Sequence, residues 1–305
     1  MDSVFTFGLP SICDSARASC RPRLRTWVLR SLLMLLLIGF APSASLAAEA
    51  ESALIPSIRR IQERGELLIG IPPYNTPPFY YRTAPDRDLQ GYDIDIGRSI
   101  ARRLGVRPVF DQRSTSFNDL VVRAGRGEVD LAIGKLGTTY PRLFDAQPHA
   151  YMRFRQALLI NRQVLSRIGR ESDPQLGIRL QEAPIRIGVI QKSAYDTFVK
   201  DVFPKASVML FKDWPATVQA LKSGDVDAIY RDSNEIRMLT LQDPRLALRY
   251  IDVIIDDMID VKSMFVGNAS EDLGPFIDFL VSSEFGIPDD KQIMKKFQSF
   301  YRRQG

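Results

Sequence analysis

Residues 125–142 (GRGEVDLAIGKLGTTYPR) carry two cations at the end of a short apolar run. A glycine break precedes the run at 129–133, which predicts a buried strand, and a glycine-bracketed loop with Lys135 and then Arg142 follows it. In αβ proteins ligands gather at the carboxyl ends of strands, where loop N–H groups and side chains converge. A lysine and an arginine leaving one strand end therefore predict an anionic guest.

A similar unit recurs ninety-seven positions further along the chain. The first unit starts at Phe117 and the second at Trp214, and each gives a helix pattern, a glycine and a short strand. The strand of the second unit, AIYRD, ends in Asp232, which falls opposite Lys135 in this register. The matched order of elements predicts two similar lobes, with a cation and an anion at equivalent strand ends.

Strand and helix patterns alternate around these units. An apolar strand at 66–71 is followed by a helix pattern that ends at Gly105 and by a second strand at 106–110. Strand, helix, strand in this order predicts a βαβ unit with parallel strands. Residues 185–198 repeat the first strand and its loop. The predicted fold class is therefore α/β, with two αβ lobes.

Two extended segments can connect the lobes, one near residues 151–160 and one near 251–261. With these two hinge crossings, lobe 1 is expected to comprise 49–153 plus 256–305, and lobe 2 to comprise 154–255. The C-terminal helical patterns have no strand repeat of their own. We expect them to pack back on the first lobe.

The first 48 residues have the order of a secretory signal peptide. Arginines precede an apolar run at 32–40, and small residues follow, with expected cleavage near Ala47 or Ala48. The run is short for a membrane span, and an uncleaved anchor is the alternative. Cleavage predicts a periplasmic location.

Removal of this segment changes the composition. Cys13 and Cys20 both lie in it, so the mature chain has no thiol for a disulfide, a nucleophile or a metal site. The formal net charge falls from +5 to +2, because the segment holds five Arg and two acidic residues. A weakly basic chain without a Lys/Arg run gives no case for nucleic acid as a partner.

The chain resembles the type 3 family of extracellular solute-binding proteins, the amino-acid receptors of ABC importers. The resemblance is carried by GELLIGI…PPF, GYDIDIGRSIARRLG, FNDLVVRAGRGEVDLAIGKLGTTYPR and GVIQKSAYDTF…ALKSGDVDAIYRD. It implies two lobes of the periplasmic-binding-protein type II kind that close around a ligand, and a membrane permease as partner. No cofactor, metal or catalytic residue is expected, and we expect a monomer.

The resemblance also implies roles for charged residues. Arg142 matches the arginine that grips the ligand's α-carboxylate, and Asp232 matches the aspartate that accepts its α-ammonium. Gly137 stands where the family usually has Ser or Thr beside the carboxylate. The alternatives are a solvated arginine at a helix start for Arg142 and a helix N-cap for Asp232.

Three further positions complete the expected ligand site. Phe117 matches the aromatic that lies against the ligand side chain, with Tyr74 or Thr76 on the other side. A plain core aromatic is the alternative for Phe117. Ser193 opens a helix with Asp196 three residues on, which predicts a capping box whose N–H groups also help to hold a carboxylate.

Lys135 departs from the family pattern, which has a small hydroxyl residue there. It can neutralise a second acidic group of the ligand, pair with Asp232 and exclude amino acids while admitting plain carboxylates, or point to solvent. These alternatives stay open. The only histidine, His149, cannot make a His-rich metal site alone and is expected to be structural.

The predicted function is a receptor that captures a small amino acid or related carboxylate and delivers it to an ABC importer. A periplasmic sensor or accessory binding protein is one alternative. A cyclohexadienyl dehydratase-like enzyme, with Glu235 or Asp232 as general acid, is the other.

Overall fold

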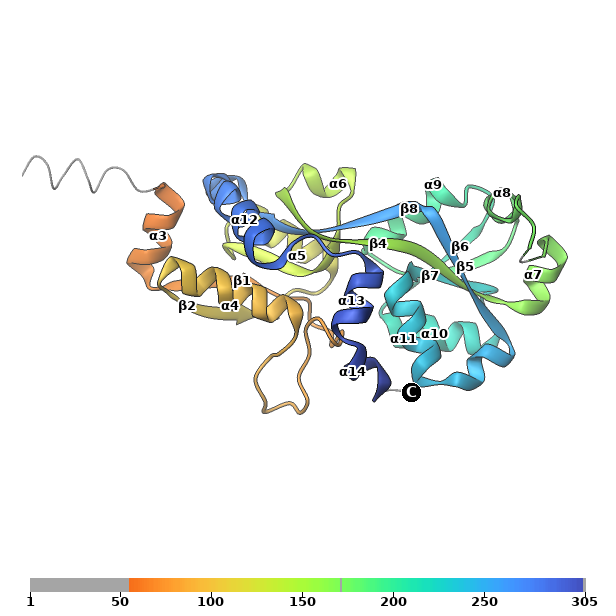
Figure 1. Ribbon diagram of the computed structural model, residues 1–305. Helices are drawn as coiled ribbons and strands as arrows, with labels where there is room; N and C mark the ends of the chain where they lie inside the picture. The colour runs from red at the N-terminus through yellow and green to blue at the C-terminus, as the bar shows by residue number, and fades with distance from the viewer. Residues whose placement is uncertain (1–54, 171, 304–305) are drawn as a thin grey trace, which may run out of the picture. The chain divides into compact units, whose positions relative to one another are not determined.

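A computed structural model of the chain describes residues 55–170 and 172–303 (Figure 1). The predicted signal peptide, residues 1–48, lies outside these residues. Among the helices of the described part, none combines the length and apolar character that crossing a membrane requires.

One mixed sheet of eight strands organises residues 55–303, with the strand order β2-β1-β3-β8-β4-β7-β5-β6. The order is symmetrical about the central β8 and β4 pair. The strands are β1 (Glu66–Gly70), β2 (Arg107–Asp111), β3 (Leu131–Gly137), β4 (Gln147–Asn161), β5 (Arg186–Ile190), β6 (Ser207–Phe211), β7 (Ala228–Asp232) and β8 (Tyr250–Val266).

Each side of the sheet has the same local topology. In the first lobe β1 pairs in parallel with β2 and β3, and in the second lobe β5 pairs in parallel with β6 and β7. The first-lobe helices are α3 (Pro56–Arg64), α4 (Tyr92–Leu104), α5 (Phe117–Gly125) and α6 (Tyr140–Leu143). The second-lobe helices are α7 (Arg162–Ile168), α8 (Leu176–Gln181), α9 (Ala194–Val202), α10 (Trp214–Ser223), α11 (Ser233–Gln242) and the 3-10 helix Pro244–Leu248. The α/β prediction with two similar lobes is confirmed.

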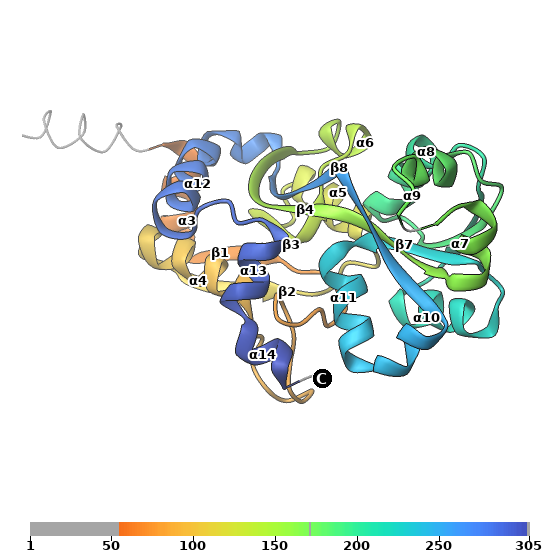
Figure 2. The ribbon, with the colours of Figure 1, turned by 45° about the vertical axis from the view of Figure 1, so that its right-hand side comes forward.

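The long strands β4 and β8 run from one lobe to the other (Figures 1 and 2). They pair antiparallel along most of their length, with register shifts between Ala150 and Met152 and between Arg155 and Gln156. Both predicted crossings lie within these strands. The second shift falls close to the predicted lobe boundary at 153/154, which stays a prediction.

The strand β3 differs from its prediction. It runs over Leu131–Gly137 instead of 129–133, and its pairing with β8 is interrupted between Ala132 and Leu136. Inside this irregularity Gly134 and Lys135 have positive φ angles of 148° and 53°. A bulge of this kind re-aims a side chain. Lys135 therefore leaves the strand at a bulge, and not from a loop beyond its end.

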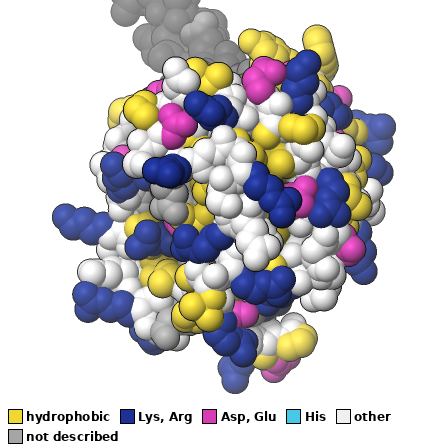
Figure 3. Space-filling model, turned by 90° about the vertical axis from the view of Figure 1, so that its right-hand side faces the viewer, with side chains coloured by type: hydrophobic (Ala, Val, Ile, Leu, Met, Phe, Trp, Pro, Cys, Tyr) yellow, Lys and Arg dark blue, Asp and Glu magenta, His cyan; other side chains and the backbone are white. Residues whose placement is uncertain are grey.

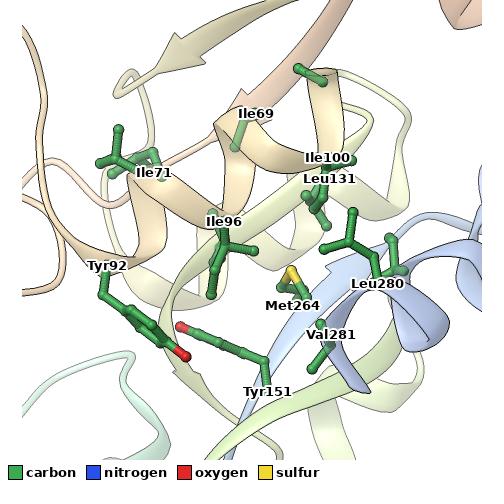
Figure 4. Close-up of a cluster of buried hydrophobic side chains, with 14 of the residues drawn as sticks. Ile69, Ile71, Tyr92, Ile96, Ile100, Leu131, Tyr151, Met264, Leu280 and Val281 are labelled. Carbon is green, nitrogen blue, oxygen red and sulfur yellow. The ribbon is translucent and has the colours of Figure 1, made fainter. Parts of the chain in front are cut away.

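Each lobe has its own apolar core. Figure 4 shows the first-lobe core, where Ile96 and Ile100 of α4 lie among side chains from β3, β8 and the C-terminal region. The periodic spacing of these isoleucines buries one face of α4. Full burial of one such side chain stabilises the fold by about 1.5–3 kcal/mol. The second core lies around Ile187 and Val189 of β5, with Val199 of α9.

The C-terminal region packs on more than the first lobe. It comprises a 3-10 helix (Asn268–Leu273), α12 (Gly274–Leu280), a π-helical turn (Val281–Phe285), α13 (Asp290–Lys296) and α14 (Gln298–Arg302). Ile277 of α12 joins the first-lobe core, as predicted. The α13 and α14 helices also contact α11 of the second lobe. The buried Ser233 at the start of α11 donates a hydrogen bond to Asp290 of α13, and the neighbouring Asn234 accepts one from Tyr301 of α14.

Figure 3 views the molecule from the end formed by the second lobe. Lys and Arg side chains are spread over this face, with fewer Asp and Glu side chains between them. The basic character of the chain is thus carried on its surface here as scattered charges.

Candidate functional site

Two adjoining cavities lie between the lobes. The smaller, of about 20 Å³, has room for roughly one water molecule. The larger, of about 330 Å³, shares Phe117, Ile190 and Arg231 with it. Six of the eight predicted site residues line the small cavity: Phe117, Lys135, Gly137, Arg142, Ser193 and Asp232. The other two, Tyr74 and Thr76, line the large one.

Arg142 lies on α6 and is only 3% exposed. Its Nε and Nη2 donate to Asn118 Oδ1 at 3.0 and 2.8 Å, and its Nη1 donates to the Gly137 carbonyl at 2.7 Å. Among the described residues no carboxylate lies within 4 Å of the guanidinium. Burial lowers the pKa of Arg142 to about 10, although the charge of Asp260 acts in the opposite direction. The side chain is therefore a fixed, protonated donor group with N–H capacity left over.

Lys135 reaches across the cleft from the first lobe to the second. Its Nζ donates to Glu235 Oε1 at 2.6 Å and to Asp232 Oδ1 at 3.1 Å. The ammonium also lies 4.4 Å from the ring centre of Phe79 and 5.2 Å from that of Phe154. Of the three alternatives for Lys135, the structure shows pairing with Asp232. The side chain is 3% exposed, so it does not point to solvent.

Asp232 ends β7 and caps α11, accepting a hydrogen bond from the Glu235 backbone N at 3.1 Å. Its Oδ2 lies 3.5 Å from the Nζ of Lys262. Burial alone would raise the pKa of Asp232, but Lys135, Lys262 and Arg231 outweigh it and hold that pKa below its usual value. The N-cap prediction is confirmed, and the carboxylate is engaged by two lysines as well.

The charge balance around Asp232 affects any cation brought near it. Two unit charges 4 Å apart interact by about 4 kcal/mol at an effective dielectric constant of 20. A third ammonium placed against Asp232 would have to compete with Lys135 and Lys262 for a carboxylate that both lysines already neutralise. Repulsion from these two lysines would offset the attraction of the carboxylate groups for the added cation.

Sequence reasoning missed Asp260 and Lys262 of β8 as site residues. Asp260 Oδ2 accepts a hydrogen bond from the Tyr195 hydroxyl at 2.7 Å and pairs with Lys262 Nζ. Both charged residues are fully buried or nearly so. Because they are two positions apart, they lie on the same face of the strand. Two charged residues on one face of a hinge strand were the sequence signal that could have identified them as site residues.

Gly137 lies at a close contact between the two lobes. A Cβ at this position would be 2.7 Å from the Cβ of Ala194 in the second lobe and 2.6 Å from Asp260 Oδ1. Contacts under 3.0 Å require one of the groups to move. The absence of the Ser or Thr side chain expected from the family has a steric reason here.

The predicted capping box at Ser193 is wrong. The Ser193 hydroxyl donates to the Ile190 carbonyl at 2.6 Å and does not cap α9. The Asp196 carboxylate accepts instead from the Lys192 backbone N at 3.1 Å. The hydroxyl turns back because the preceding strand end offers it a buried acceptor. Ser193 still lines the small cavity.

Aromatic side chains form the wall between the two cavities. The rings of Phe117 and Tyr74 are 5.5 Å apart and tilted by 42°. Phe117 is buried among first-lobe side chains and also lines both cavities, so the core and ligand-contact interpretations both apply. Thr76 pairs through its backbone with Tyr80.

Arg231 is a second buried guanidinium at the cavities, and it was not predicted. It lies 4.7 Å over the Trp214 ring, a cation–π arrangement. Glu235 Oε2 is 4.0 Å away, too far for a hydrogen bond. Within the described residues Arg231 has no hydrogen bond to a carboxylate.

His149 is part of the packing beneath α12. Its Nδ1 lies 3.0 Å from Asp278 Oδ1, and its ring packs against Gly274. In the part of the chain that the structure describes, no three His, Cys, Asp or Glu side chains are grouped so as to hold a metal ion.

Two αβ lobes joined by a pair of antiparallel strands, with cavities between them lined by aromatic and charged side chains, define a two-lobed solute-binding protein. Residues 68–231 match the family model described as bacterial extracellular solute-binding proteins, family 3. The chain belongs to this family, which confirms the resemblance.

Individual relatives are distant. The chain is 23% identical over 222 residues to the glutamine-binding protein of Geobacillus stearothermophilus, covering 72% of this chain and 79% of that protein. It is 21% identical over 203 residues to the L-cystine-binding protein TcyJ of Escherichia coli, covering 67% and 71%.

Solved structures show the same fold. The amino acid ABC transporter substrate-binding protein AbpA from Streptococcus pneumoniae, bound to L-arginine, has a TM-score of 0.63 at 19% identity, covering 81% of this chain and 98% of that one. The ancestral amino acid-binding protein AncCDT-1, a precursor of cyclohexadienyl dehydratase, has a TM-score of 0.58 at 19% identity, covering 81% and 96%.

Proposed function

We propose that this protein captures a small carboxylate-bearing solute, an amino acid or a related acid, in the interlobe cleft and presents it to the membrane permease of an ABC importer. Relatives named as glutamine-binding and L-cystine-binding proteins support a solute of this size. An ABC transporter substrate-binding protein among the structural neighbours supports the importer as partner. A receptor of this kind works in the periplasm, and we propose that location.

The observation that carries the proposal is the state of Arg142. A guanidinium that is buried, protonated and without a carboxylate partner in the described residues is costly unless an anion completes its hydrogen bonds. It lines the small cavity between the lobes. A carboxylate that enters when the lobes part and enlarge this space accepts charge-assisted hydrogen bonds from a planar donor, and such bonds are among the strongest in proteins.

The position of Arg142 also explains how solute binding would favour closure of the lobes. Arg142 belongs to the first lobe, whereas Ser193 and Ala194 on the opposite cavity wall belong to the second. A solute that contacts both walls binds the closed arrangement more tightly than an open one. It therefore shifts the population towards closure.

We propose binding without catalysis. The two carboxyl groups considered as general acids, Glu235 and Asp232, both accept hydrogen bonds from Lys135. For Asp232, burial would raise the pKa, but Lys135, Lys262 and Arg231 hold it below its usual value, so this carboxyl group is a poor proton donor.

The test is a thermal-shift screen of small acids and amino acids on the purified protein, repeated on Arg142→Ala. A binding solute should raise the melting temperature of the wild type. The variant should lose that shift, because hydrogen bonds to charged groups contribute about 1.5–3 kcal/mol, or roughly 10- to 100-fold in affinity.

Arg126→Ala is the matched control, since Arg126 is an exposed arginine of the same lobe. It should keep the full shift. Circular dichroism checks that Arg142→Ala is folded. A folded Arg142→Ala that retains the wild-type shift contradicts the proposed site.

A further inference from the structure

We propose that the solute is an organic acid without an α-ammonium group. The inference rests on the proposed function and narrows its substrate class. It comes from a comparison of the polar groups in the cleft that already have hydrogen-bond partners in the protein with those that have none. A ligand binds best when it supplies what the buried groups lack.

The acceptors beside the small cavity are engaged by the protein's own lysines. Asp232 and Glu235 both take the Lys135 ammonium, and Asp260 takes that of Lys262. Lys262 is also 3.5 Å from Asp232. A ligand ammonium beside Asp232 finds that carboxylate occupied and two like charges next to it.

Glu235 Oε2, which belongs to the large cavity, and the fully buried Asp260 Oδ1 make no hydrogen bond within the described residues. The second of these is the one near the small cavity. It faces Gly137, where even a single added carbon would be 2.6 Å away. Asp260 is not among the residues that line the small cavity. This oxygen is therefore closed off from a ligand ammonium by the contact between the lobes.

The guanidinium donors at the cavities, unlike these carboxylates, have no oppositely charged hydrogen-bond partner among the described residues. Arg142 makes hydrogen bonds only to an amide oxygen and a backbone carbonyl, and Arg231 stacks on Trp214 without a carboxylate in hydrogen-bond range among the described residues. Both guanidinium groups line the small cavity, and Arg231 lines the large one too. At the small cavity the unused hydrogen-bonding capacity therefore lies with the guanidinium donors, whereas the carboxylate of Asp232 is paired with lysines.

The larger cavity allows an extended acid. A carboxylate at Arg142 can continue past Phe117 into the 330 Å³ space, where Arg231 offers a second site for a carbonyl or carboxylate oxygen. Asp213, which borders this space, uses its Oδ1 to cap α10, whereas its Oδ2 is 4.0 Å from Lys212 Nζ, too far for a hydrogen bond. The proposed exclusion therefore applies to an ammonium group on the carbon next to the carboxylate that Arg142 binds.

The experiment compares acids that differ only by the α-ammonium group. Isothermal titration of the purified, solute-free protein uses three pairs: glutarate and glutamate, succinate and aspartate, and 3-phenylpropanoate and phenylalanine. In at least one pair the wild type should bind the ammonium-free member, at least tenfold more tightly than its amino-acid partner.

Lys135→Ser should reduce or abolish this preference. It removes one ammonium and opens space beside Asp232, so the amino acid should gain at least tenfold relative to its partner. Lys135→Met removes the charge but keeps the bulk, and amino-acid binding should gain less than in Lys135→Ser. Lys192→Ser is the matched control, because Lys192 also has a positive φ, of 55°, but its side chain is exposed.

The possible failures are distinguishable. Wild-type protein that binds an amino acid as tightly as its ammonium-free partner, with binding lost in Arg142→Ala, overturns this inference and leaves the proposed function intact. The inference also falls if the wild type binds no member of any pair while Lys135→Ser binds an amino acid. If neither protein binds any of the six compounds, the inference fails, whereas the proposed function is decided separately by the thermal-shift screen on the wild type and Arg142→Ala.

Discussion

Single residues in this chain show how burial changes the behaviour of a charge. Asp93, near the start of α4, is fully buried in the first lobe. Burial raises the pKa of Asp93 to about 7, although the Tyr151 hydroxyl and the charge of Lys135 act in the opposite direction. By contrast, Asp232 keeps a lowered pKa at equal burial because cations surround it. Neighbouring cations, and not burial alone, decide which carboxyl ionises.

Asp93→Asn should remove a pH dependence of stability. Because the pKa of Asp93 is raised on folding, its protonated form stabilises the fold fully below about pH 4, and this contribution is lost as the pH rises through about 7. Each pKa unit corresponds to about 1.4 kcal/mol. Between pH 5 and pH 8 the free energy of unfolding of the wild type should therefore fall, relative to the variant, by roughly 2–4 kcal/mol.

Urea unfolding at pH 5 and pH 8 measures this difference. Asp95→Asn is the control, since Asp95 is an exposed residue of the same helix and should leave the pH dependence unchanged. Equal pH dependence in the wild type and Asp93→Asn would contradict the raised pKa.

Some of the candidate site was predictable from single residues and some was not. Lys135 and Asp232 were found because strand ends and an internal repeat marked them. Asp260, Lys262 and Arg231 were missed because they lie inside strands, where a charged residue usually faces solvent. Their burial depends on the other lobe, which no local pattern encodes.

At the scale of elements, the tail links the two lobes beside the hinge. The Tyr301 hydroxyl of α14 donates to Asn234 Oδ1 at 2.6 Å, and the Ser233 hydroxyl donates to Asp290 Oδ2 of α13 at 2.5 Å. The sequence predicted the tail helices but placed them on the first lobe alone. Helix patterns give an apolar face, whereas these interlobe contacts are polar and involve side chains far apart in sequence.

Tyr301→Phe should weaken this link. A side-chain hydrogen bond contributes about 0.5–1.5 kcal/mol, and its loss leaves the buried Asn234 amide without this donor. The free energy of unfolding from urea titration should fall by about 1–2 kcal/mol. Tyr140→Phe is the control, because Tyr140 is 86% exposed, and it should change nothing. Unchanged stability of Tyr301→Phe would show that the bond does not form.

At the scale of the whole molecule, the repeat explains how the cleft is built. Lys135 and Asp232 occupy equivalent positions in the two units, and in the structure their side chains form a hydrogen bond between the lobes. The topology of both lobes was predictable, since strand and helix patterns are local. The closeness of the lobes was not, because it depends on small residues at the contact, such as Gly137 and Ala194.

Gly137→Ser should prevent full closure. The new Cβ would be 2.7 Å from the Cβ of Ala194, which is short and rigid, and 2.6 Å from Asp260 Oδ1. The Asp260 carboxylate is held in place through its other oxygen, Oδ2, by Tyr195 and Lys262. The lobes must therefore part, while each lobe's own core is left intact.

Small-angle X-ray scattering of Gly137→Ser should show a larger radius of gyration, and the affinity for any solute found in the screen should fall at least tenfold. Gly177→Ser, where a Cβ meets no atom within 4 Å, should match the wild type in both measurements. An unchanged radius and affinity in Gly137→Ser would mean that the lobes do not meet at this position when the solute is bound.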